Sequence, residues 1–352
     1  GTPLQADLIL STDPDEEVRC ELAMKIGRLV PELDAEESEQ LTEMALEVLE
    51  ILANDELPRV RAIIAEELKS EKNVPKNIVQ HLAEDLEDIV SVPILEYSPL
   101  LSEADLLEII ARGMKGRALV AVARRRNVTE PVVDAVVAKK DTKATKAIIE
   151  NETSKISDKT FDTISDEADD NKEWHNAMVY RDGLPVRTIM RIATFVSASL
   201  METLIERNTG QKDVVEKLRK TVRGRIEKGQ LKEDKDDDIV PALDRANEDF
   251  KNGDLDEERV DKALDEGDNA YVRYALINLS ELTQETVSKM LNTGSAKAIT
   301  ALVWKAGLSM GMAVQIQQKL GRVSGSKLLK PTADGGFPLS QDDFDWYMES
   351  FF

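Results

Sequence analysis

Residues 13–33 read DPDEEVRCELAMKIGRLVPEL, an acidic turn followed by Val-Arg and by apolar residues at helical spacing. Leu33 and the following Asp34 form an aliphatic residue and a helix-capping residue, which we call a boundary pair. Further boundary pairs, with Ser, Thr, Asp or Pro second, start at Val74, Leu101, Val128, Ile156, Leu184, Leu255, Leu282, Leu308 and Leu339. Their numbers step by 27, 27, 28 and 28 from Val74 to Leu184, and by 27 and 26 from Leu255 to Leu308. The chain therefore repeats a unit of about 27 residues.

Each repeat has the features of two short helices joined by a turn. Ser, Thr and Asp accept hydrogen bonds from the free amides of a first helical turn, and Pro suits the first helical position. Asp34 with Glu37, and Ser102 with Asp105, have the spacing of a capping box. A pair of short helices cannot bury its apolar face alone, so neighbouring repeats must share a core. We therefore predict an all-α fold, a right-handed α-solenoid, rather than a set of independent helical bundles.

Several stretches resemble known families. DEEVRCELAMKIGRL (15–29), LPRVRAIIAEEL (57–68) and DNAYVRYAL (268–276) resemble HEAT repeats, whose second helix begins with an acidic or proline turn and Val-Arg. DIVSVPILEYSPLLSEADLLEII (88–110), followed by AVARRRNVTEPVVDAVV (121–137), resembles an uncharacterised alphaproteobacterial family, domain-of-unknown-function family 2336. The resemblance covers most of residues 10–320. It implies a HEAT-like helical fold and carries neither an activity nor catalytic residues.

The spacing of boundary pairs predicts the domain organisation. The step from Leu184 to Leu255 is 71 residues, and RTIMRIATFVSASLMETLIERN (187–208) within it predicts one unusually long helix. QKDVVEKLRKTVRGRIEKGQLKEDKDDD (211–238) predicts a charged helix ending in an acidic loop at 232–238. The predicted parts are an N-terminal HEAT-like array (1–200), a long charged helical insertion with its acidic loop (201–240), C-terminal HEAT-like repeats (241–330) and an aromatic C-terminal cap or docking tail (331–352).

Composition argues against several classes of function. The 352-residue chain has a net charge of −22, so its field repels nucleic acid and anionic membrane surfaces. No stretch approaches the roughly 18 apolar residues of a membrane-spanning helix, and no secretory signal is visible. The single cysteine, Cys20, lies in an apolar helical pattern and is expected to be a buried thiol. These features predict a cytoplasmic protein.

The usual signatures of catalysis and metal binding are missing from the sequence. His81 and His175 lack nearby Cys or acidic residues at ligand spacing, and neither a phosphate-binding glycine loop nor a serine nucleophile elbow is present. We expect no catalytic residues, no metal and no cofactor. Asp15, Arg19, Arg61 and Arg273 occupy equivalent turns of the repeats and are expected to form a structural Asp–Arg ladder between layers.

One region has a positive net charge, although the chain as a whole is acidic. Between Arg112 and Ile149, ten Lys or Arg residues face three Asp or Glu residues, a net charge of +7. Equivalent residues of consecutive repeats lie side by side, so the sequence predicts a basic strip. It is either a solvated face paired with acids of adjacent repeats, or a site for an acidic or phosphorylated protein segment. The candidate residues are Arg117, Arg124, Arg125, Arg126, Lys139, Lys140, Lys143 and Lys146.

The C-terminal residues concentrate aromatic side chains in a chain that is only 4% aromatic. They are Phe344, Trp346, Tyr347, Phe351 and Phe352. This tail is either a cap on the last repeat or a short docking segment for a partner, including a second copy of the chain.

HEAT-like arrays mostly bind other proteins, so the leading functional hypothesis is a non-enzymatic scaffold or adaptor, for example for a signalling component. One alternative is a HEAT-like enzyme such as a DNA glycosylase or a bilin-attaching lyase. The glycosylase reading conflicts with the acidic charge and with the absence of Trp, Tyr and Phe from the +7 region. The other alternative is a structural protein that self-associates through its aromatic end.

Overall fold

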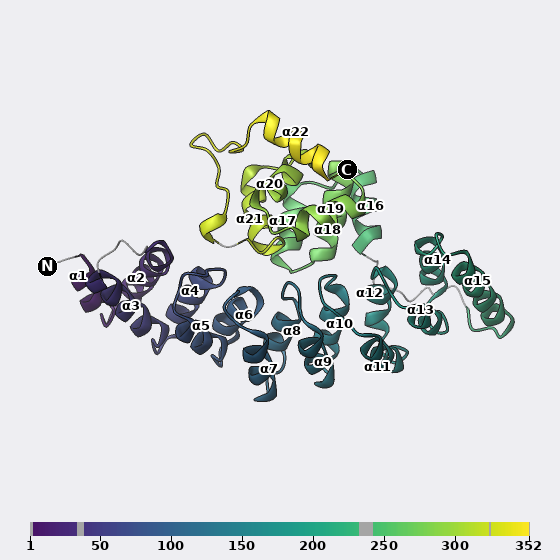
Figure 1. The fold of residues 1–352 in the computed structure, drawn as a ribbon, viewed down its shortest axis with the longest axis horizontal. Coiled ribbons are helices and arrows are strands. Elements are labelled where there is room, and N and C mark those ends of the chain that lie inside the picture. The colour runs from purple at the N-terminus through teal and green to yellow at the C-terminus, as the bar shows by residue number, and fades with distance from the viewer. Residues whose placement is uncertain (1–2, 34–38, 232–241, 324, 352) are drawn as a thin grey trace. The chain divides into compact units, whose positions relative to one another are not determined.

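The computed structural model describes residues 3–33, 39–231, 242–323 and 325–351. Within these ranges every regular element is a helix and no strand occurs, which confirms the predicted all-α fold (Figure 1). The first helices are α1 (Pro3–Leu10), α2 (Glu16–Leu29), α3 (Glu39–Ala53), α4 (Pro58–Leu68), α5 (Lys76–Ala83) and α6 (Asp88–Tyr97).

The next helices are α7 (Glu103–Ala111), α8 (Arg117–Ala123), α9 (Glu130–Ala138), α10 (Thr142–Glu150), α11 (Asp158–Ala168), α12 (His175–Tyr180), α13 (Val186–Ile192), α14 (Ala198–Arg207) and α15 (Lys212–Glu227). The last are α16 (Ala242–Lys251), α17 (Glu257–Asp265), α18 (Asn269–Ser280), α19 (Gln284–Asn292), α20 (Ala296–Lys305), α21 (Met310–Lys319) and α22 (Gln341–Ser350).

The boundary pairs mark the starts of helices, as predicted. Helix α7 begins directly after Leu101-Ser102, and Ser102 Oγ accepts a hydrogen bond from Asp105 N at 3.1 Å. Asp105 Oδ2 accepts one from Ser102 N at 2.8 Å, which completes the predicted capping box. The side chains that cap later helices in the same way include Ser157, Thr283, Ser309 and Ser340. The capping box expected between Asp34 and Glu37 lies outside the described residues.

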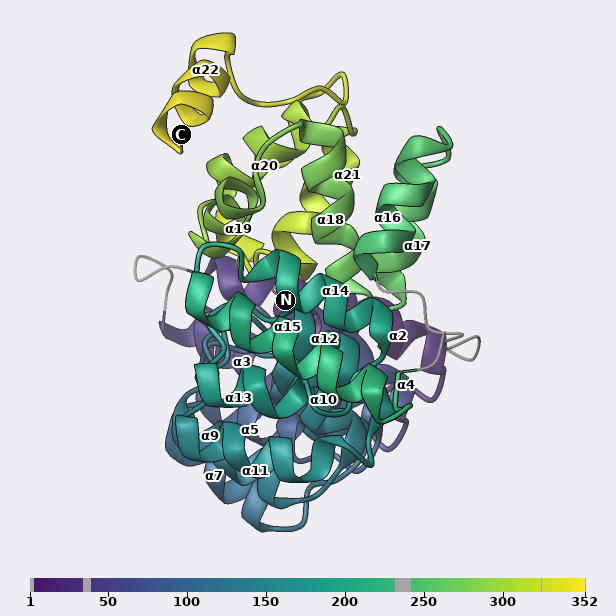
Figure 2. The ribbon, with the colours of Figure 1, turned by 90° about the vertical axis from the view of Figure 1, so that its right-hand side faces the viewer.

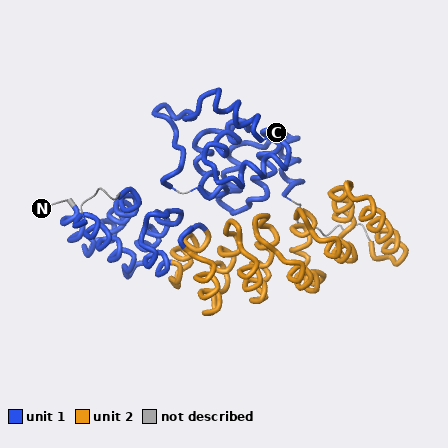
Figure 3. Tube along the Cα trace, in the orientation of Figure 1, with its two compact units in different colours: residues 1–82, 97–100, 240–352 blue, residues 83–96, 101–239 orange. Residues whose placement is uncertain are grey.

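The chain divides into two compact units (Figure 3). Unit 1 comprises residues 1–82, 97–100 and 240–352, and unit 2 comprises residues 83–96 and 101–239. In unit 2, each odd-numbered helix from α7 to α13 packs on the next odd-numbered helix, and each even-numbered helix from α8 to α12 packs on the next even-numbered one. Figure 1 shows these two sets as two rows. Because each short helix packs on the next but one, successive helix pairs of unit 2 share a core.

The single long helix predicted over 187–208 is wrong. Helix α13 ends at Ile192, and α14 begins at Ala198 after Ser197, whose Oγ accepts a hydrogen bond from Leu200 N at 3.3 Å. The hydroxyl satisfies a free amide of a new first turn, so a continuous apolar pattern is divided between two helices. The charged helix predicted from residue 211 is confirmed as α15, which begins 26 residues after α13 does. The acidic loop predicted at 232–238 lies outside the described residues.

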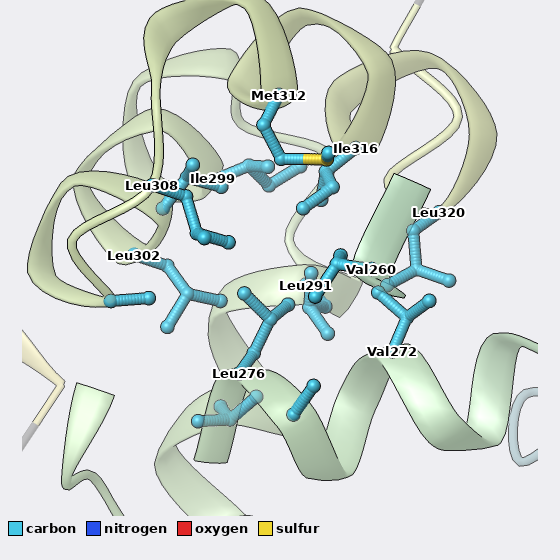
Figure 4. Packing of buried hydrophobic residues seen from close by; sticks show 14 of the residues in the cluster. Val260, Val272, Leu276, Leu291, Ile299, Leu302, Leu308, Met312, Ile316 and Leu320 are labelled. Carbon is cyan, nitrogen blue, oxygen red and sulfur yellow. The ribbon is translucent and has the colours of Figure 1, made fainter. Parts of the chain in front are cut away.

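Unit 1 has its own apolar core. In its N-terminal part, α2 packs on α3 and α4, and Cys20 is buried as predicted, with its thiol pKa raised by that burial. In its C-terminal part, α18 packs on α16, α17, α19 and α20. Leu276, Ile299 and Ile316 are among the fully buried residues of this core (Figure 4). A segment without α-helix, residues 328–340, leads to α22 (Figure 2). Helix α22 packs on α20.

A buried carboxylate follows α4. Burial raises the pKa of Glu71, and the neighbouring Glu32 and Glu67 raise it further, while Lys330 acts in the opposite direction. The folded state therefore binds the Glu71 proton more tightly than the unfolded chain does. This difference stabilises the folded state fully when the pH is below the pKa that Glu71 has in the unfolded chain. The stabilisation is lost as the pH rises through the higher pKa that Glu71 has in the folded protein.

We expect Glu71→Gln to raise the melting temperature at pH 7, because the amide mimics the protonated acid and removes the cost of a buried charge. The difference from the wild type should disappear below about pH 4, where both states of the wild type are protonated. Thermal unfolding followed by circular dichroism across this pH range measures the effect. Glu47→Gln, at an exposed position of α3, is the control, and an equal response of both variants would contradict the prediction.

Candidate functional site

The structure divides the predicted basic strip into two groups. Arg117 is the first residue of α8 and Arg124 is its C-cap, so the seven-residue helix separates them. Lys139 and Lys140 follow the C-terminal end of α9, and Lys143 lies in the first turn of α10. Arg117, Lys139, Lys140 and Lys143 therefore belong to turns that join an odd-numbered helix to the next even-numbered one. Arg124, Arg125 and Arg126 belong to the opposite ends of the even-numbered helices.

The second group includes a structural arginine. Arg125 Nη1 donates a hydrogen bond to Leu95 O, near the C-terminal end of α6, at 2.7 Å. The last carbonyls of a helix have no partner within the helix, and a cation is favoured beside them. Arg125 therefore joins α8 to the even-numbered helix that precedes it. Arg124 and Arg126 are half-buried, and Lys146 pairs with Glu150 along α10 at 3.6 Å.

The same arrangement recurs along the even-numbered helices of unit 2. Asn151 Nδ2 donates to Ala123 O at 2.9 Å, and Arg207 Nη2 donates to Tyr180 O at 2.8 Å. Arg181 Nη1 donates to the carbonyls of Ile149 at 3.0 Å and Asn151 at 2.8 Å. In each case a residue at or just after the end of one helix reaches the C-terminal carbonyls of the preceding even-numbered helix. We call this set the carbonyl ladder; its members are Arg125, Asn151, Arg181 and Arg207.

Of the residues expected to form an Asp–Arg ladder between layers, Arg19 is found in such a pair in unit 1, with Asp55. Arg19 Nε of α2 lies 2.8 Å from Asp55 Oδ2, in the turn before α4, and both side chains are buried. Arg61 Nη1 of α4 donates to Asp55 O at 2.8 Å. Asp15 instead caps α2 by accepting a hydrogen bond from Glu17 N at 3.0 Å. The partner of Arg19 is thus the aspartate of the next helix pair.

The first basic group, Arg117, Lys139, Lys140 and Lys143, is exposed. Among the described residues, none of the ion pairs involves Arg117, Lys139, Lys140 or Lys143, and all four residues are exposed. Arg112, in contrast, pairs with Glu84 and with Glu108. These four cations are therefore the part of the predicted strip that remains available to a ligand.

Lys140 adopts a backbone conformation that is costly for its residue type. Its φ is 54°, in the left-handed region, directly after the C-cap of α9. After α7, the chain has Gly113, with a φ of 105°. Glycine adopts this conformation at little cost, whereas a residue with a Cβ atom loses roughly 1–2 kcal/mol. Glu281, the C-cap of α18, has a similar φ of 60°, so the left-handed residue at this position ends α9.

Exposed aliphatic side chains lie at the preceding turn. Leu86, between α5 and α6, is 97% exposed, and Ile89 in α6 is 58% exposed. The ion pair between Glu84 and Arg112 connects this turn to the turn between α7 and α8. The turn surface is defined here as Leu86, Ile89, Arg117, Lys139, Lys140 and Lys143. Neighbouring helices pack 8–10 Å apart, so three successive turns extend over roughly 20 Å.

The aromatic tail has one buried face and one exposed face. Phe344 is 4% exposed; its ring stacks on Trp304 at 4.1 Å and meets Phe337 edge-on at 5.9 Å. Tyr347 and Phe351 pack against the same core, and Thr286 Oγ1 donates to Phe351 O at 3.3 Å. Trp346 is 60% exposed. The last predicted tail residue, Phe352, lies outside the described residues.

The histidines show no constellation for catalysis or metal binding. His175 is buried, its Nε2 lies 2.6 Å from Ala168 O, and its ring lies 4.9 Å from that of Phe195. His81 is exposed. Among the described residues, no cluster of three or more His, Cys, Asp or Glu side chains could hold a metal ion. In the same part of the chain, no helix combines the length and the apolar character required to cross a bilayer.

Comparison with known proteins gives one match. A family model described as "Uncharacterised protein conserved in bacteria (DUF2336)" matches residues 90–332, which is 243 of the 352 residues. The matched range includes the four cations of the turn surface and the carbonyl ladder, and it ends before α22. Neither the curated proteins nor the solved structures contain a match to the chain.

Proposed function

Because the chain belongs to DUF2336, a family of uncharacterised bacterial proteins, we propose a function from its own geometry. The protein is a non-enzymatic scaffold that binds an acidic segment of another protein at the turn surface. The scaffold is a right-handed α-solenoid of HEAT-like helix pairs, and it works in the cytoplasm, for example beside a signalling component.

Helix packing in unit 2 supports the solenoid. Odd-numbered and even-numbered helices each pack on the next member of their own row. The odd-numbered helices from α7 to α15 start at intervals of 26 to 28 residues. The carbonyl ladder connects each even-numbered helix to the one before it. Such an array presents equivalent turns of consecutive repeats side by side, which creates an extended surface for a partner.

One observation carries the proposal: four cations, Arg117, Lys139, Lys140 and Lys143, are exposed, and none of them forms an ion pair with a described residue. They lie in a chain whose net charge is −22. An isolated exposed ion pair contributes only about 0–1 kcal/mol, so binding requires several cations acting together with apolar contacts. Leu86 and Ile89 provide exposed apolar area along the same surface.

The partner segment is expected to be extended, acidic and partly aliphatic. A surface of roughly 20 Å accommodates about six extended residues. Carboxylates of Asp and Glu, or a phosphorylated side chain, would face the cations, and Leu or Ile would contact Leu86 and Ile89. Because the charges are exposed, salt should weaken the complex.

We expect the triple substitution K139E/K140E/K143E to weaken binding of such segments at least about tenfold, since it replaces attraction by repulsion at three positions. The probe is an array of short labelled peptides that combine several Asp or Glu residues with Leu or Ile, with and without phosphoserine. Fluorescence polarisation measures the dissociation constants at low and high salt.

The control is K217E/K220E, which reverses two charges at exposed positions of α15. This control should leave peptide binding within a factor of about two, because a distant exposed charge is screened. The proposal is wrong if no peptide of the array binds, or if the triple variant and the control bind the peptides equally well.

A further inference from the structure

Helix α22 presents two different faces. Phe344, Tyr347, Met348 and Phe351 pack against the core of unit 1. Asp342, Asp345, Trp346 and Glu349 follow the same i, i+3, i+4, i+7 spacing on the other side, and all four are exposed. We call these four residues the outer face of α22.

The outer face combines negative charge with a large exposed aromatic ring. Among the described residues, no ion pair involves Asp342, Asp345 or Glu349, and Asp345 accepts a hydrogen bond only from the neighbouring Gln341, at 3.0 Å. Trp346 is 60% exposed, whereas Phe250, the other exposed aromatic side chain within the described ranges, is 45% exposed and lies next to Lys251. The Trp346 ring meets the ring of Tyr347 edge-on at 4.8 Å, and tryptophan is enriched where proteins bind one another.

The outer face of α22 and the turn surface are complementary in chemistry. One surface has three carboxylates around an indole, and the other has four cations beside Leu86 and Ile89. Helix α22 has 10 residues and is therefore about 15 Å long, which is comparable to the roughly 20 Å of the turn surface. The stack of Phe344 on Trp304 holds α22 on its core with the outer face exposed.

We propose that the outer face of α22 in one copy of this chain docks on the turn surface of a second copy. The inference rests on the proposed function, because it uses the same turn surface, here for a helical acidic face of a second copy rather than for an extended segment. The carboxylates of Asp342, Asp345 and Glu349 face the lysines and Arg117, and the Trp346 indole contacts Leu86 and Ile89. Two different surfaces meet, so each added copy leaves another turn surface and another α22 unoccupied, and association continues head to tail.

Such a contact is weak and sensitive to salt. One helix face buries far less than the roughly 1,600 Å² of a standard stable interface, so we expect a dissociation constant on the order of 10–100 µM. The exposed charges are screened at high ionic strength, so raising the salt from about 0.05 M to about 0.5 M should weaken the association further.

A charge-swap experiment with the full chain tests the proposal by sedimentation velocity over a range of concentrations. Variant A is D342K/D345K/E349K, and variant B is R117E/K139E/K140E/K143E. Each variant alone should lose at least about tenfold in association, because like charges then meet. An equimolar mixture should associate again, because the positive α22 of A meets the negative turn surface of B.

One single substitution and one control variant complete the test. Trp346→Ala should weaken self-association several-fold with an unchanged melting temperature, since the side chain is exposed. K217E/K220E should associate like the wild type. A chain that is monomeric at every concentration, self-association that survives in A or B, or a mixture of A and B that stays monomeric would each overturn the proposal.

The two proposals fail in different ways. If variant A associates normally while K139E/K140E/K143E still loses binding of acidic peptides, the docking of α22 is wrong and the proposed function stands. If reversing the charges of the turn surface in variant B changes neither self-association nor peptide binding, both the docking of α22 and the proposed function are wrong.

Discussion

Replacing Arg181 with alanine is expected to lower the free energy of unfolding of unit 2 by about 3 kcal/mol. The guanidinium donates hydrogen bonds to Ile149 O at 3.0 Å, Asn151 O at 2.8 Å and Ser154 O at 2.7 Å. Burial removes water from the guanidinium and lowers the pKa of Arg181. Alanine would remove the donors that Arg181 supplies to Ile149 O and Ser154 O, which are part-buried, and each such loss costs roughly 1–3 kcal/mol. Asn151 O would keep Ser154 N as a donor, at 2.9 Å.

Urea denaturation followed by circular dichroism measures this loss, and amide exchange at the end of α10 localises it. Arg181→Lys should recover part of the stability, because an ammonium group can serve some of the carbonyls but lacks the planar fork of the guanidinium. Arg219→Ala, at an exposed position of α15, should stay within about 0.5 kcal/mol of the wild type. A loss below about 1 kcal/mol in Arg181→Ala would show that the ladder contributes little.

Phe344→Ala should destabilise the C-terminal part of unit 1 by about 3–5 kcal/mol. The ring is buried, stacks on Trp304 and meets Phe337 edge-on, so alanine leaves a cavity and removes both aromatic contacts. We expect α22 to detach from α20, which limited proteolysis of residues 328–352 would detect. Thermal unfolding measures the change in stability.

Trp346→Ala is the comparison within the same helix. Its side chain is 60% exposed, so the substitution should change the stability by less than about 0.5 kcal/mol. Equal losses in the two variants would contradict the assignment of a buried and an exposed face to α22.

Local chemistry explains which parts of the fold could be predicted from the sequence. Helix starts depend on a capping side chain a few residues away, so pairs such as Leu101-Ser102 located them. The break between α13 and α14 was missed because the apolar pattern continues through it, and only the cap at Ser197 reveals the new start. The start of α15 follows Gly210 and Gln211, neither of which belongs to the residue types used to recognise a boundary pair.

The candidate site could be predicted only in part, because the spacing of residues along the sequence does not show which side chains are exposed or which turns lie close together. The basic residues were found by counting charge, but α8 has only seven residues, so Arg117 and Arg124 lie at its two ends. The apolar part of the turn surface was missed, because an aliphatic residue at a turn can be buried or exposed, and Leu86 is exposed. The carbonyl ladder was missed because its acceptors are backbone atoms about 30 residues away, for example Leu95 O for Arg125.

The carbonyl ladder also determines where this protein can be shortened. A fragment that stops at Tyr180 retains every residue of α12 but lacks Arg181, so the end of α10 loses the hydrogen bonds that Arg181 donates to it. Extending the fragment to Asp182 restores them. Fragment boundaries in unit 2 should therefore be placed beyond the ladder side chain rather than at the last helical residue, because the final turn of each helix is completed by the helix pair that comes after it.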